Sequence, residues 1–419
     1  MAARTRARAR HAERAPRHRV LVAIASAVTA ITGFVLVGGT SYALLAQGAV
    51  ERTDIAALTA PTTETTAEPE EEPEPTDFAA GEPINILLVG SDERNGENGA
   101  IGGRVAEGMR SDTTMIMHIS GDRSRIDVVS IPRDLRVRIS DCQMFDGTTV
   151  RGWTAKFNTA FSLGGSNGDR AEAAACTMRT VTDFSGVEFN NHYVVIDFYG
   201  FEQMIDSLGG VPMCITQDII SPKANLELEA GAQVLDGQTA LGFARARTGT
   251  GLGDGTDLMR IDRQHELLTN TARKALGLNL LTDIQRLTDF VRSGAESLTM
   301  DPQLGSITNL GGLAWHLRSF DTANLNFSTI PWAYAGDASG DVVMVEAEAQ
   351  EMFARLVADE PLVDPEPETG ASASPSPSPS ASTSAEHDAD ATPTPSATAT
   401  EPVRETEDDI LASCSIDDL

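Results

Sequence analysis

Ile84-Asn-Ile-Leu-Leu-Val-Gly-Ser-Asp92 is the stretch of this sequence that decides the fold. It is a short, mostly apolar run that ends in Gly90, and such a run is typical of a buried β-strand. Two more strands are predicted at Thr113–Ile119 and Arg125–Ile131, and the turn residues Gly121-Asp122 join them. Together the three strands predict the centre of a sheet.

Strand and helix patterns alternate over the rest of residues 84–358, which we expect to form one folded domain. Asp197 can N-cap a helix, and Gly209-Gly210 can end it. The mixture predicts a layered α/β fold in which a central mixed sheet lies between helices. Further strands are predicted at 192–196, 211–215 and 326–330, and helices at 169–184, 198–208, 236–246, 257–276, 281–298, 301–317 and 345–357.

The N-terminal part of the chain has the pattern of a membrane anchor. Residues 1–19 contain seven arginines and one glutamate, and no charged side chain occurs from Val20 to Val50. An apolar helix of about 20 residues can cross a bilayer, and the preceding arginines favour a cytoplasmic N-terminus. We therefore expect a cytoplasmic arm at 1–19, a transmembrane helix at 20–47 and an extracellular domain. The apolar run is longer than that of a signal peptide, ~7–15 residues, although Ala-Gln-Gly-Ala at 46–49 leaves cleavage open.

Two segments that flank the domain have the composition of chains that do not fold. Residues 48–83 are rich in Pro, Thr and Glu, and we interpret them as an acidic linker. Residues 359–419 are acidic and rich in Ser, Thr and Pro, and we interpret them as a disordered tail. The whole chain has a formal net charge of −29. This charge disfavours nucleic-acid binding, which needs a basic surface.

Charged residues lie at the predicted ends of the three central strands. Asp92 follows the first strand, Arg110 and Asp112 precede the second, and Arg133 and Asp134 follow the third. Because loops at strand ends build the ligand crevice of open α/β sheets, we expect these side chains to meet. Carboxylates among arginines suit a divalent cation such as Mg²⁺ together with a phosphate. For each motif alone, a surface ion pair or a turn cap is the alternative.

A second polar group surrounds the glycine-rich loop at 248–256, which we interpret as flexible. Backbone amides at the start of the following helix favour anions. The loop lacks a Gly-Lys-Ser/Thr ending and follows no strand, so it is neither a P-loop nor a dinucleotide fingerprint. We interpret the group as a polyphosphate clamp, and a mobile linker beside a solvated helix face is the alternative. Its members are Arg245, Arg247, Arg260, Arg263 and Gln264, of which Arg260 and Gln264 share a helix face.

Other catalytic patterns are weak in this sequence. HExxH, paired CxxC and GxSxG motifs do not occur, so zinc hydrolysis and a serine-hydrolase elbow lack support. His118 and His192 fall in predicted strands and are expected to be packing residues. A single long apolar run excludes a polytopic membrane protein, and four cysteines in a chain of 419 residues exclude a disulfide-framework miniprotein.

The cysteines that follow the predicted anchor lie in a compartment where disulfides can form. We predict a disulfide between Cys142 and Cys176. The sequence leaves open whether the remaining two, Cys214 and Cys414, pair with each other, because spacing does not determine connectivity.

Seven short motifs occur in a fixed order along residues 84–276. They are Asn85-Ile-Leu-Leu-Val-Gly-Ser-Asp92, Arg110-Ser-Asp-Thr113, Ser130-Ile-Pro-Arg-Asp134, Lys156-Phe-Asn158, Leu235-Asp-Gly-Gln-Thr-Ala240, Arg245-Ala-Arg247 and Asp257-Leu-Met-Arg-Ile-Asp-Arg-Gln264. This ordered set resembles the LytR-CpsA-Psr family of envelope proteins in its actinobacterial form. The short cytoplasmic arm, the single anchor and the external domain agree with the resemblance.

The resemblance implies a phosphotransferase that moves a wall glycopolymer from a polyprenyl pyrophosphate carrier to the 6-hydroxyl of N-acetylmuramic acid in peptidoglycan. By motif, Asp92 and Asp112 would hold Mg²⁺ or Mn²⁺, Asp92 is the nominal general base, and Asp134 would orient the arginine before it. The expected catalytic residues are Asp92, Arg110, Asp112 and Arg133. The residues expected to contact the pyrophosphate are Arg110, Arg133, Arg245, Arg247, Arg260 and Arg263, with Gln264 in support.

The sequence departs from the family pattern at two places. A Cys near position 232 is common in related sequences, whereas Ala232 here leaves Cys214 without that partner. The tail also lacks the second folded domain that is often appended in this family.

Two other functions compete with the transferase. A non-catalytic binder of wall polymer or lipid carrier would need the arginines but not the metal carboxylates. Transcriptional attenuation is disfavoured because the predicted cytoplasmic arm at 1–19 has no DNA-binding module. The polymer itself, whether arabinogalactan, a teichoic-type polymer or capsule, stays open.

Overall fold

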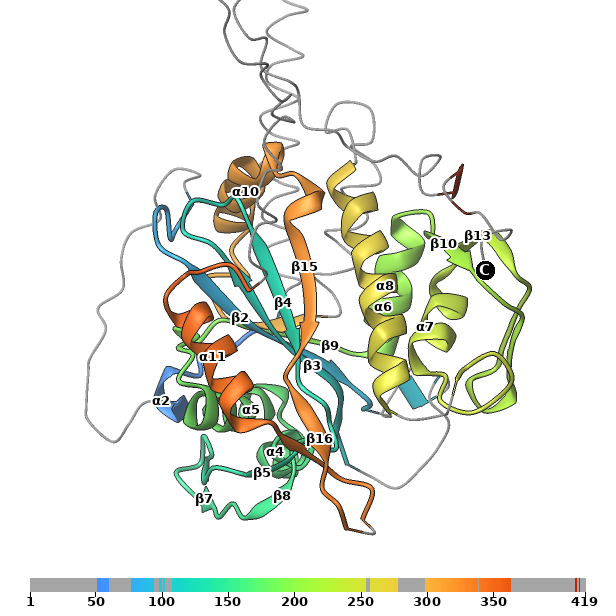
Figure 1. Cartoon of the computed structure of the whole chain (residues 1–419). Coiled ribbons are helices and arrows are strands. Elements are labelled where there is room, and N and C mark those ends of the chain that lie inside the picture. The colour runs from blue at the N-terminus through green and yellow to red at the C-terminus, as the bar shows by residue number, and fades with distance from the viewer. Residues whose placement is uncertain are drawn as a thin grey trace, which may run out of the picture. The chain divides into compact units, whose positions relative to one another are not determined.

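A seven-stranded mixed sheet forms the centre of the computed structural model (Figure 1), in the strand order β1-β14-β9-β2-β3-β4-β15. β2 and β4 each pair antiparallel with β3, while β9 joins β2 and β15 joins β4 in parallel. The structure describes residues 51–59, 77–93, 98–99, 101, 108–253, 257–277, 298–337, 339–362, 411–412 and 414. The strands are β1 (Glu51–Arg52), β14 (Leu298–Met300), β9 (Tyr193–Ile196), β2 (Ile84–Ser91), β3 (Ser111–Ile119), β4 (Ile126–Ser130) and β15 (Leu325–Thr329).

Helices cover both faces of this sheet because successive strand residues point to opposite sides. Leu87 packs into one hydrophobic core, and its neighbour Ile86 packs into the other. Val129 and Val128 of β4 divide in the same way. The predicted layered fold is therefore confirmed. The first face is covered by α2 (Ala56–Thr59), α4 (Thr159–Gly164), α5 (Arg170–Ser185) and α11 (Glu346–Val357), and the second by α10 (Ile307–His316) and part of α8 (Asp257–Gly277).

A separate, smaller core lies beyond α8, on the right in Figure 1. Its buried residues come from two helices and two hairpins, and Leu267 of α8 packs against them. The sequence patterns predicted its helices and the strand at 211–215 but not that they enclose a core of their own. The elements are α6 (Phe198–Ser207), α7 (Gly237–Arg245), β10 (Val211–Ile215) with β13 (Gly231–Leu235), and β11 (Ile219–Ser221) with β12 (Leu226–Leu228).

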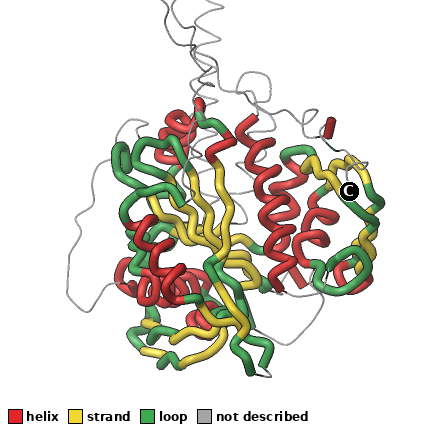
Figure 2. The backbone as a smooth tube through the Cα atoms, viewed as in Figure 1, coloured by secondary structure: helices red, strands yellow, loops and turns green. Residues whose placement is uncertain are grey.

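Several short strands escaped prediction because two or three residues show no periodicity. Figure 2 shows them among the loops. The predicted helix at 301–317 is shorter than expected, since α10 begins at Ile307. The predicted helix at 281–298 lies outside the described residues except for Leu298, which belongs to a strand. The short pairs are β5 (Arg136–Arg138) with β8 (Thr154–Lys156), β6 (Cys142–Gln143) with β7 (Thr149–Val150), and β16 (Trp332–Tyr334) with β17 (Val342–Met344).

The folded part begins before residue 84, which corrects the predicted linker. Residues 51–52 pair with β14, and Ile55 and Leu58 are buried in the core beside α5. Asp77 accepts hydrogen bonds of 2.7 and 3.0 Å from the buried Arg123 guanidinium. The sequence missed this because each anchoring segment is only a few residues long.

The predicted arm at 1–19 and transmembrane helix at 20–47 lie outside the described residues. Within the part of the chain that the structure describes, no helix is long and apolar enough to cross a membrane.

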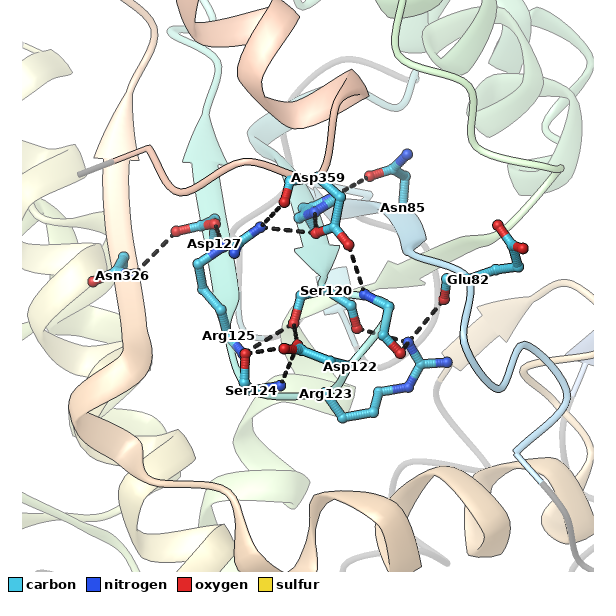
Figure 3. Close-up of polar contacts among 12 residues, drawn as sticks. Glu82, Asn85, Ser120, Asp122, Arg123, Ser124, Arg125, Asp127, Asn326 and Asp359 are labelled. Atoms are coloured by element: carbon cyan, nitrogen blue, oxygen red, sulfur yellow. Dashed lines mark hydrogen bonds and ion pairs between the residues drawn. The ribbon is translucent and has the colours of Figure 1, made fainter. Parts of the chain in front are cut away.

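The segment after α11 is also part of the fold, so the predicted tail begins later than residue 359. The Asp359 carboxylate accepts hydrogen bonds from the Gly121 N–H at 2.9 Å and from Arg125 at 2.8 Å, and it lies 3.0 Å from His118 Nε2. Figure 3 shows this network at the turn between β3 and β4. Arg125 also contacts Asp127, so one buried network joins β3, β4 and the end of α11.

The two disulfides connect distant segments. Cys142 pairs with Cys176, as predicted, and joins β6 to α5. Cys214 pairs with Cys414, which resolves the pairing that the sequence left open. In the β10–β13 ladder Cys214 faces Ala232, so the paired strand offers it no cysteine. Here a residue 200 positions away supplies the partner instead.

The two histidines predicted to be packing residues are buried. His118 lies between Asn85 and Asp359, and its Nδ1 is 2.7 Å from the Asn85 Oδ1. His192 packs edge-on against Phe78 and lies 3.3 Å from Asp301. Both therefore have polar partners as well as packing roles.

The Asp359→Asn substitution is expected to lower the free energy of unfolding by about 1–3 kcal/mol at neutral pH, because hydrogen bonds to a charged group are lost. Burial would raise the pKa of Asp359, but hydrogen bonds from Gly121 and His118 lower it below its ordinary value. The stabilisation is therefore complete above the unfolded-state pKa of about 3.9 and declines as the pH falls through the folded-state value.

Urea denaturation of wild type and Asp359→Asn measures this difference in the free energy of unfolding. The measurements run from about pH 3 to about pH 7, a range that includes the unfolded-state pKa. Glu351→Gln, at an exposed position of α11, is the control and should change stability by less than about 0.5 kcal/mol. A difference between wild type and Asp359→Asn that grows below pH ~4 would contradict the assignment.

Candidate functional site

The charged ends of the three central strands meet at one end of the sheet. Because β3 runs antiparallel to both neighbours, its first residues lie beside the ends of β2 and β4. A cavity of about 430 Å³ opens there, between the sheet and the smaller core. It is lined by Asp92, Arg110, Asp112, Arg133, Ser221, Lys223, Ala224, Arg245, Arg247, Thr248 and Arg260. Seven of the residues predicted from the sequence thus share one cavity.

Asp92 is oriented by a pair of backbone contacts. Its N–H donates to the Arg110 carbonyl at 2.9 Å, and the Arg110 N–H donates to Asp92 Oδ1 at 2.8 Å. The β2–β3 register shifts between Gly90 and Ser91, which marks a bulge that ends regular pairing before Asp92. At Gly90, an added Cβ would lie 3.3 Å from Thr113, so the two strands approach closely here. The fold therefore holds this carboxylate in one orientation at the cavity wall.

Asp112 is bound on both its side chain and its backbone. Arg133 Nη1 donates to Asp112 Oδ1 at 2.6 Å, and Arg260 Nη2 donates to the Asp112 carbonyl at 2.8 Å. Arg260 is buried, although it comes from α8 and the other two from the sheet. Asp134 Oδ2 lies 3.7 Å from Arg133 Nε, in agreement with the expectation that Asp134 orients Arg133.

Two residues predicted to contact the pyrophosphate lie elsewhere. Arg263 does not line the cavity and donates instead to the carbonyls of Ala246 and Leu252. Gln264 donates to the Ala244 carbonyl at 3.0 Å and borders a small recess beside Asp112 and Arg260. Arg263 thus contacts the end of α7 and the loop that follows it, whereas Arg260 contacts the sheet at Asp112, and the pyrophosphate contact of Arg263 stays a prediction.

The glycine-rich segment at 248–253 is a strap rather than a flexible loop. Thr250 exchanges backbone hydrogen bonds with Ile220 of β11 at 2.9 and 3.2 Å, and Ser221 Oγ donates to the Thr248 carbonyl at 2.8 Å. Gly251 has a φ of +73°, and a Cβ there would overlap the carbonyl oxygen of Asp218. Glycine is thus needed for both conformation and close approach. The mobile-linker interpretation is wrong for these residues, and residues 254–256 lie outside the described part.

Arg245 is positioned by an aromatic ring that the sequence did not single out. Its guanidinium carbon lies 4.1 Å from the ring centroid of Phe198, at the start of α6. Such cation–π contacts contribute about 0.5–2 kcal/mol. Asp197 precedes Phe198 and caps α6 by accepting from the Gly200 N–H at 2.8 Å. The predicted N-cap is therefore confirmed, and it also places this ring.

A half-buried guanidinium connects the two walls of the cavity. Arg170, at the start of α5, donates to Glu93 and to Asp197 at 2.6 Å each. Glu93 follows Asp92, and Asp197 precedes the Phe198 ring. Burial would lower the pKa of Arg170, but the negative charges of Glu93 and Asp197 raise it above its ordinary value. No sequence motif pointed to Arg170, because its partners are distant in the chain.

The cavity is strongly cationic within an acidic chain. Six cationic side chains and two carboxylates line it, although the formal net charge of the chain is −29. Lys223, which the sequence analysis also missed, adds the sixth cation from a turn after β11. A cavity with this excess of guanidinium groups is suited to an anion with several oxygens, such as a diphosphate.

The two carboxylates of the cavity could bind a magnesium ion only if a substrate supplied further oxygen ligands. Among the residues that the structure describes, no group of three or more His, Cys, Asp and Glu side chains could hold a metal ion. Mg²⁺ is commonly held by one or two carboxylates, with substrate phosphates and water completing its coordination. Asp92 and Asp112, which line one cavity with the arginines, are a donor set of that kind.

The sequence model of the LytR_cpsA_psr family matches residues 51–357, and the chain belongs to this family. The match begins at β1 and ends with α11, in agreement with the extent of the folded part. The resemblance seen in the sequence motifs is thereby confirmed.

Curated relatives are similar over most of the domain. The probable cell wall biosynthesis protein LcpB of Corynebacterium glutamicum is 31% identical over 65% of this chain and 60% of its own. The cell wall biosynthesis protein LcpA of the same organism is 26% identical over 69% and 58%. The polyisoprenyl-teichoic acid–peptidoglycan teichoic acid transferase TagU of Halalkalibacterium halodurans is 29% identical over 56% and 66%. The chain thus spans about three fifths of the length of these relatives.

Solved structures share the fold. Protein gbs0355 from Streptococcus agalactiae matches with a TM-score of 0.52 and 20% identity, over 67% of this chain and 89% of its own. The LytR-Csp2A-Psr enzyme from Actinomyces oris matches with a TM-score of 0.50 and 19% identity, over 73% and 95%. At these identities the likeness concerns the arrangement of sheet and helices.

The Gly251→Ala substitution is expected to loosen the strap and weaken binding of inorganic pyrophosphate. The reason is that the strap's contacts with β11 hold Arg247 and Thr248 in place at the cavity. Gly147→Ala is a matched control, since Gly147 has a similar φ of +82° but no atom within 4 Å of an added Cβ. The control should lose about 1 kcal/mol of stability from backbone strain alone, and Gly251→Ala more than twice that.

Denaturant unfolding and calorimetric titration with pyrophosphate measure the two effects. Equal losses of stability and unchanged pyrophosphate binding in both variants would show that the strap does not position the site.

Proposed function

We propose that this chain is a membrane-anchored transferase that moves a glycopolymer from a polyprenyl diphosphate carrier to peptidoglycan. The observation that carries the proposal is the cavity in which six cationic side chains and two carboxylates meet at the strand ends. Membership in the LytR_cpsA_psr family supports it, as does similarity to a probable cell wall biosynthesis protein and to a teichoic acid transferase.

The donor diphosphate would lie between the two walls of the cavity. Arg110, Arg133 and Arg260 face it from the sheet and α8, while Arg245 and Arg247 face it from the end of α7. Guanidinium groups pair with phosphoryl oxygens through two parallel hydrogen bonds. Because ion pairs and carbonyl contacts already hold several of these groups, little ordering is needed when the donor binds.

The reaction would form one P–O bond and break another. The 6-hydroxyl of N-acetylmuramic acid attacks the phosphorus that carries the glycopolymer, and the bond from that phosphorus to the bridging oxygen breaks. Polyprenyl phosphate leaves with the electron pair, and the arginines stabilise the charge that develops on the phosphoryl oxygens. Asp92, which the Arg110 N–H orients at the cavity wall, would accept the hydroxyl proton.

Asp92 and Asp112 would hold Mg²⁺ or Mn²⁺, and the bound ion would supply further neutralisation of charge on the diphosphate. The apolar stretch at 20–47, with its preceding arginines, would anchor the protein with the domain outside the cell. This location places the cavity where a lipid-linked donor and the wall are both accessible.

The Asp92→Asn substitution is expected to reduce release of polyprenyl phosphate at least about 100-fold, because a positioned acid–base group is lost. Donor binding should persist, since the arginines remain. The assay uses the full-length protein in lipid nanodiscs with a short-chain polyprenyl diphosphate oligosaccharide, glycan strands and Mg²⁺. Polyprenyl phosphate is quantified by chromatography.

Asp146→Asn is the control, because this exposed carboxylate caps a turn outside the cavity. It should leave the rate unchanged. Equal rates for wild type and Asp92→Asn would contradict the role of Asp92. A wild-type protein that binds the donor and never releases polyprenyl phosphate would instead be a non-catalytic binder.

A further inference from the structure

The β16–β17 hairpin is bound to the segment that directly follows Arg133, a residue of the cavity. Its second strand donates a hydrogen bond from the Val342 N–H to the Asp134 carbonyl at 3.2 Å, and Leu135 forms a bridge with Val342. Tyr334 faces Val342 across the hairpin. Two strand spacings, roughly 10 Å, therefore separate the backbone of Tyr334 from Leu135, two residues after the cavity arginine Arg133.

A ladder of alternating charges holds this hairpin in place. Asp134 accepts from Lys156 Nζ at 2.8 Å, and Lys156 also lies 3.3 Å from Asp341. Arg136 donates to Asp341 at 2.7 Å and to Asp337 at 2.8 Å. We define the ladder as Arg133, Asp134, Lys156, Asp341, Arg136 and Asp337. It contains three cations and three carboxylates, so it presents many hydrogen-bonding groups without net charge.

An aromatic pair with one exposed member lies on the same hairpin. Trp332 and Tyr334 are two residues apart on β16, and their rings meet edge to face with centroids 5.4 Å apart. Trp332 packs against the main core, while Tyr334 is 58% exposed. The Tyr334 ring thus packs against Trp332 and is still largely open to solvent. A rigid tyrosine of this kind offers a large contact area at low entropic cost.

We propose that Tyr334 and the ladder form a subsite for the glycan strand of the acceptor, which deepens the proposed transferase function and rests on it. A pyranose ring has an apolar C–H face that stacks on an aromatic ring, and hydroxyls around its edge that pair with polar side chains. The electrically balanced ladder suits an uncharged sugar backbone better than an anionic polymer, whereas the cationic cavity suits the diphosphate donor. The acceptor strand would extend from the cavity along the hairpin.

The Tyr334→Ala substitution tests the subsite in the full-length protein in nanodiscs. We expect it to raise the KM for soluble glycan strands about five- to thirtyfold, in the range of an interface tyrosine. The KM for the lipid donor and the rate at saturating acceptor should not change. Tyr334→Phe should retain acceptor affinity, because the ring face is kept.

Trp315→Ala is the matched control, since Trp315 is 60% exposed and lies on α10, far from the hairpin in Figure 1. It should behave as wild type. An unchanged acceptor KM in Tyr334→Ala, or an equal rise in Trp315→Ala, would overturn the subsite.

A second measurement separates this proposal from the proposed reaction. Binding of a β-1,4-linked N-acetylglucosamine tetrasaccharide, followed by NMR saturation transfer, requires no turnover. Binding by wild type that is lost in Tyr334→Ala would support the subsite even if no polyprenyl phosphate were ever released. Turnover in the nanodisc assay together with equal tetrasaccharide binding by both proteins would refute the subsite and leave the transferase function intact.

Discussion

The antiparallel pairing of β2, β3 and β4 is the constraint on which the candidate site depends. It brings the end of β2, the start of β3 and the end of β4 to one place, so that carboxylates and guanidiniums from three separate motifs face each other. Arginines gathered in this way would repel one another without partners. Asp112 offsets that repulsion by binding Arg133 through its carboxylate and Arg260 through its carbonyl. The site is therefore a balance between concentrated positive charge and a few well-placed acceptors.

The smaller core supplies the opposite wall of the cavity, and its packing positions the arginines of that wall. The strap at 248–253 lies against β11, which places Arg247 at the cavity. The Phe198 ring does the same for Arg245. Arg170 joins Glu93 on one wall to Asp197 on the other, so the two halves of the cavity share a buried ion-pair network. Residues outside the lining of the cavity, such as Phe198 and Arg170, thus help to position the residues that line it.

Segments on both sides of the central domain are bound to it by a few specific contacts. Asp359 joins the end of α11 to the β3–β4 turn through charged hydrogen bonds (Figure 3). Asp77 accepts a hydrogen bond from Arg123 of the same turn and so joins the segment before β2 to it. Cys414 pairs with Cys214 where the facing strand offers only Ala232. These contacts show that segments with the composition of a linker or tail can still contain single residues that belong to the domain.

The sequence by itself determined the layered α/β fold, the strand ends that carry the site and the family. These features are local, because they depend on periodicity, on residue types at strand ends and on short ordered motifs. The tertiary structure alone decided that Arg263 faces the strap, that the glycine loop is a strap, and that Cys214 pairs with Cys414. It also decided that Lys223 lines the cavity, that the Phe198 ring contacts Arg245, and that Arg170 joins Glu93 to Asp197. Each of these depends on contacts between segments far apart in the chain, and such contacts leave no pattern in the local order of residues.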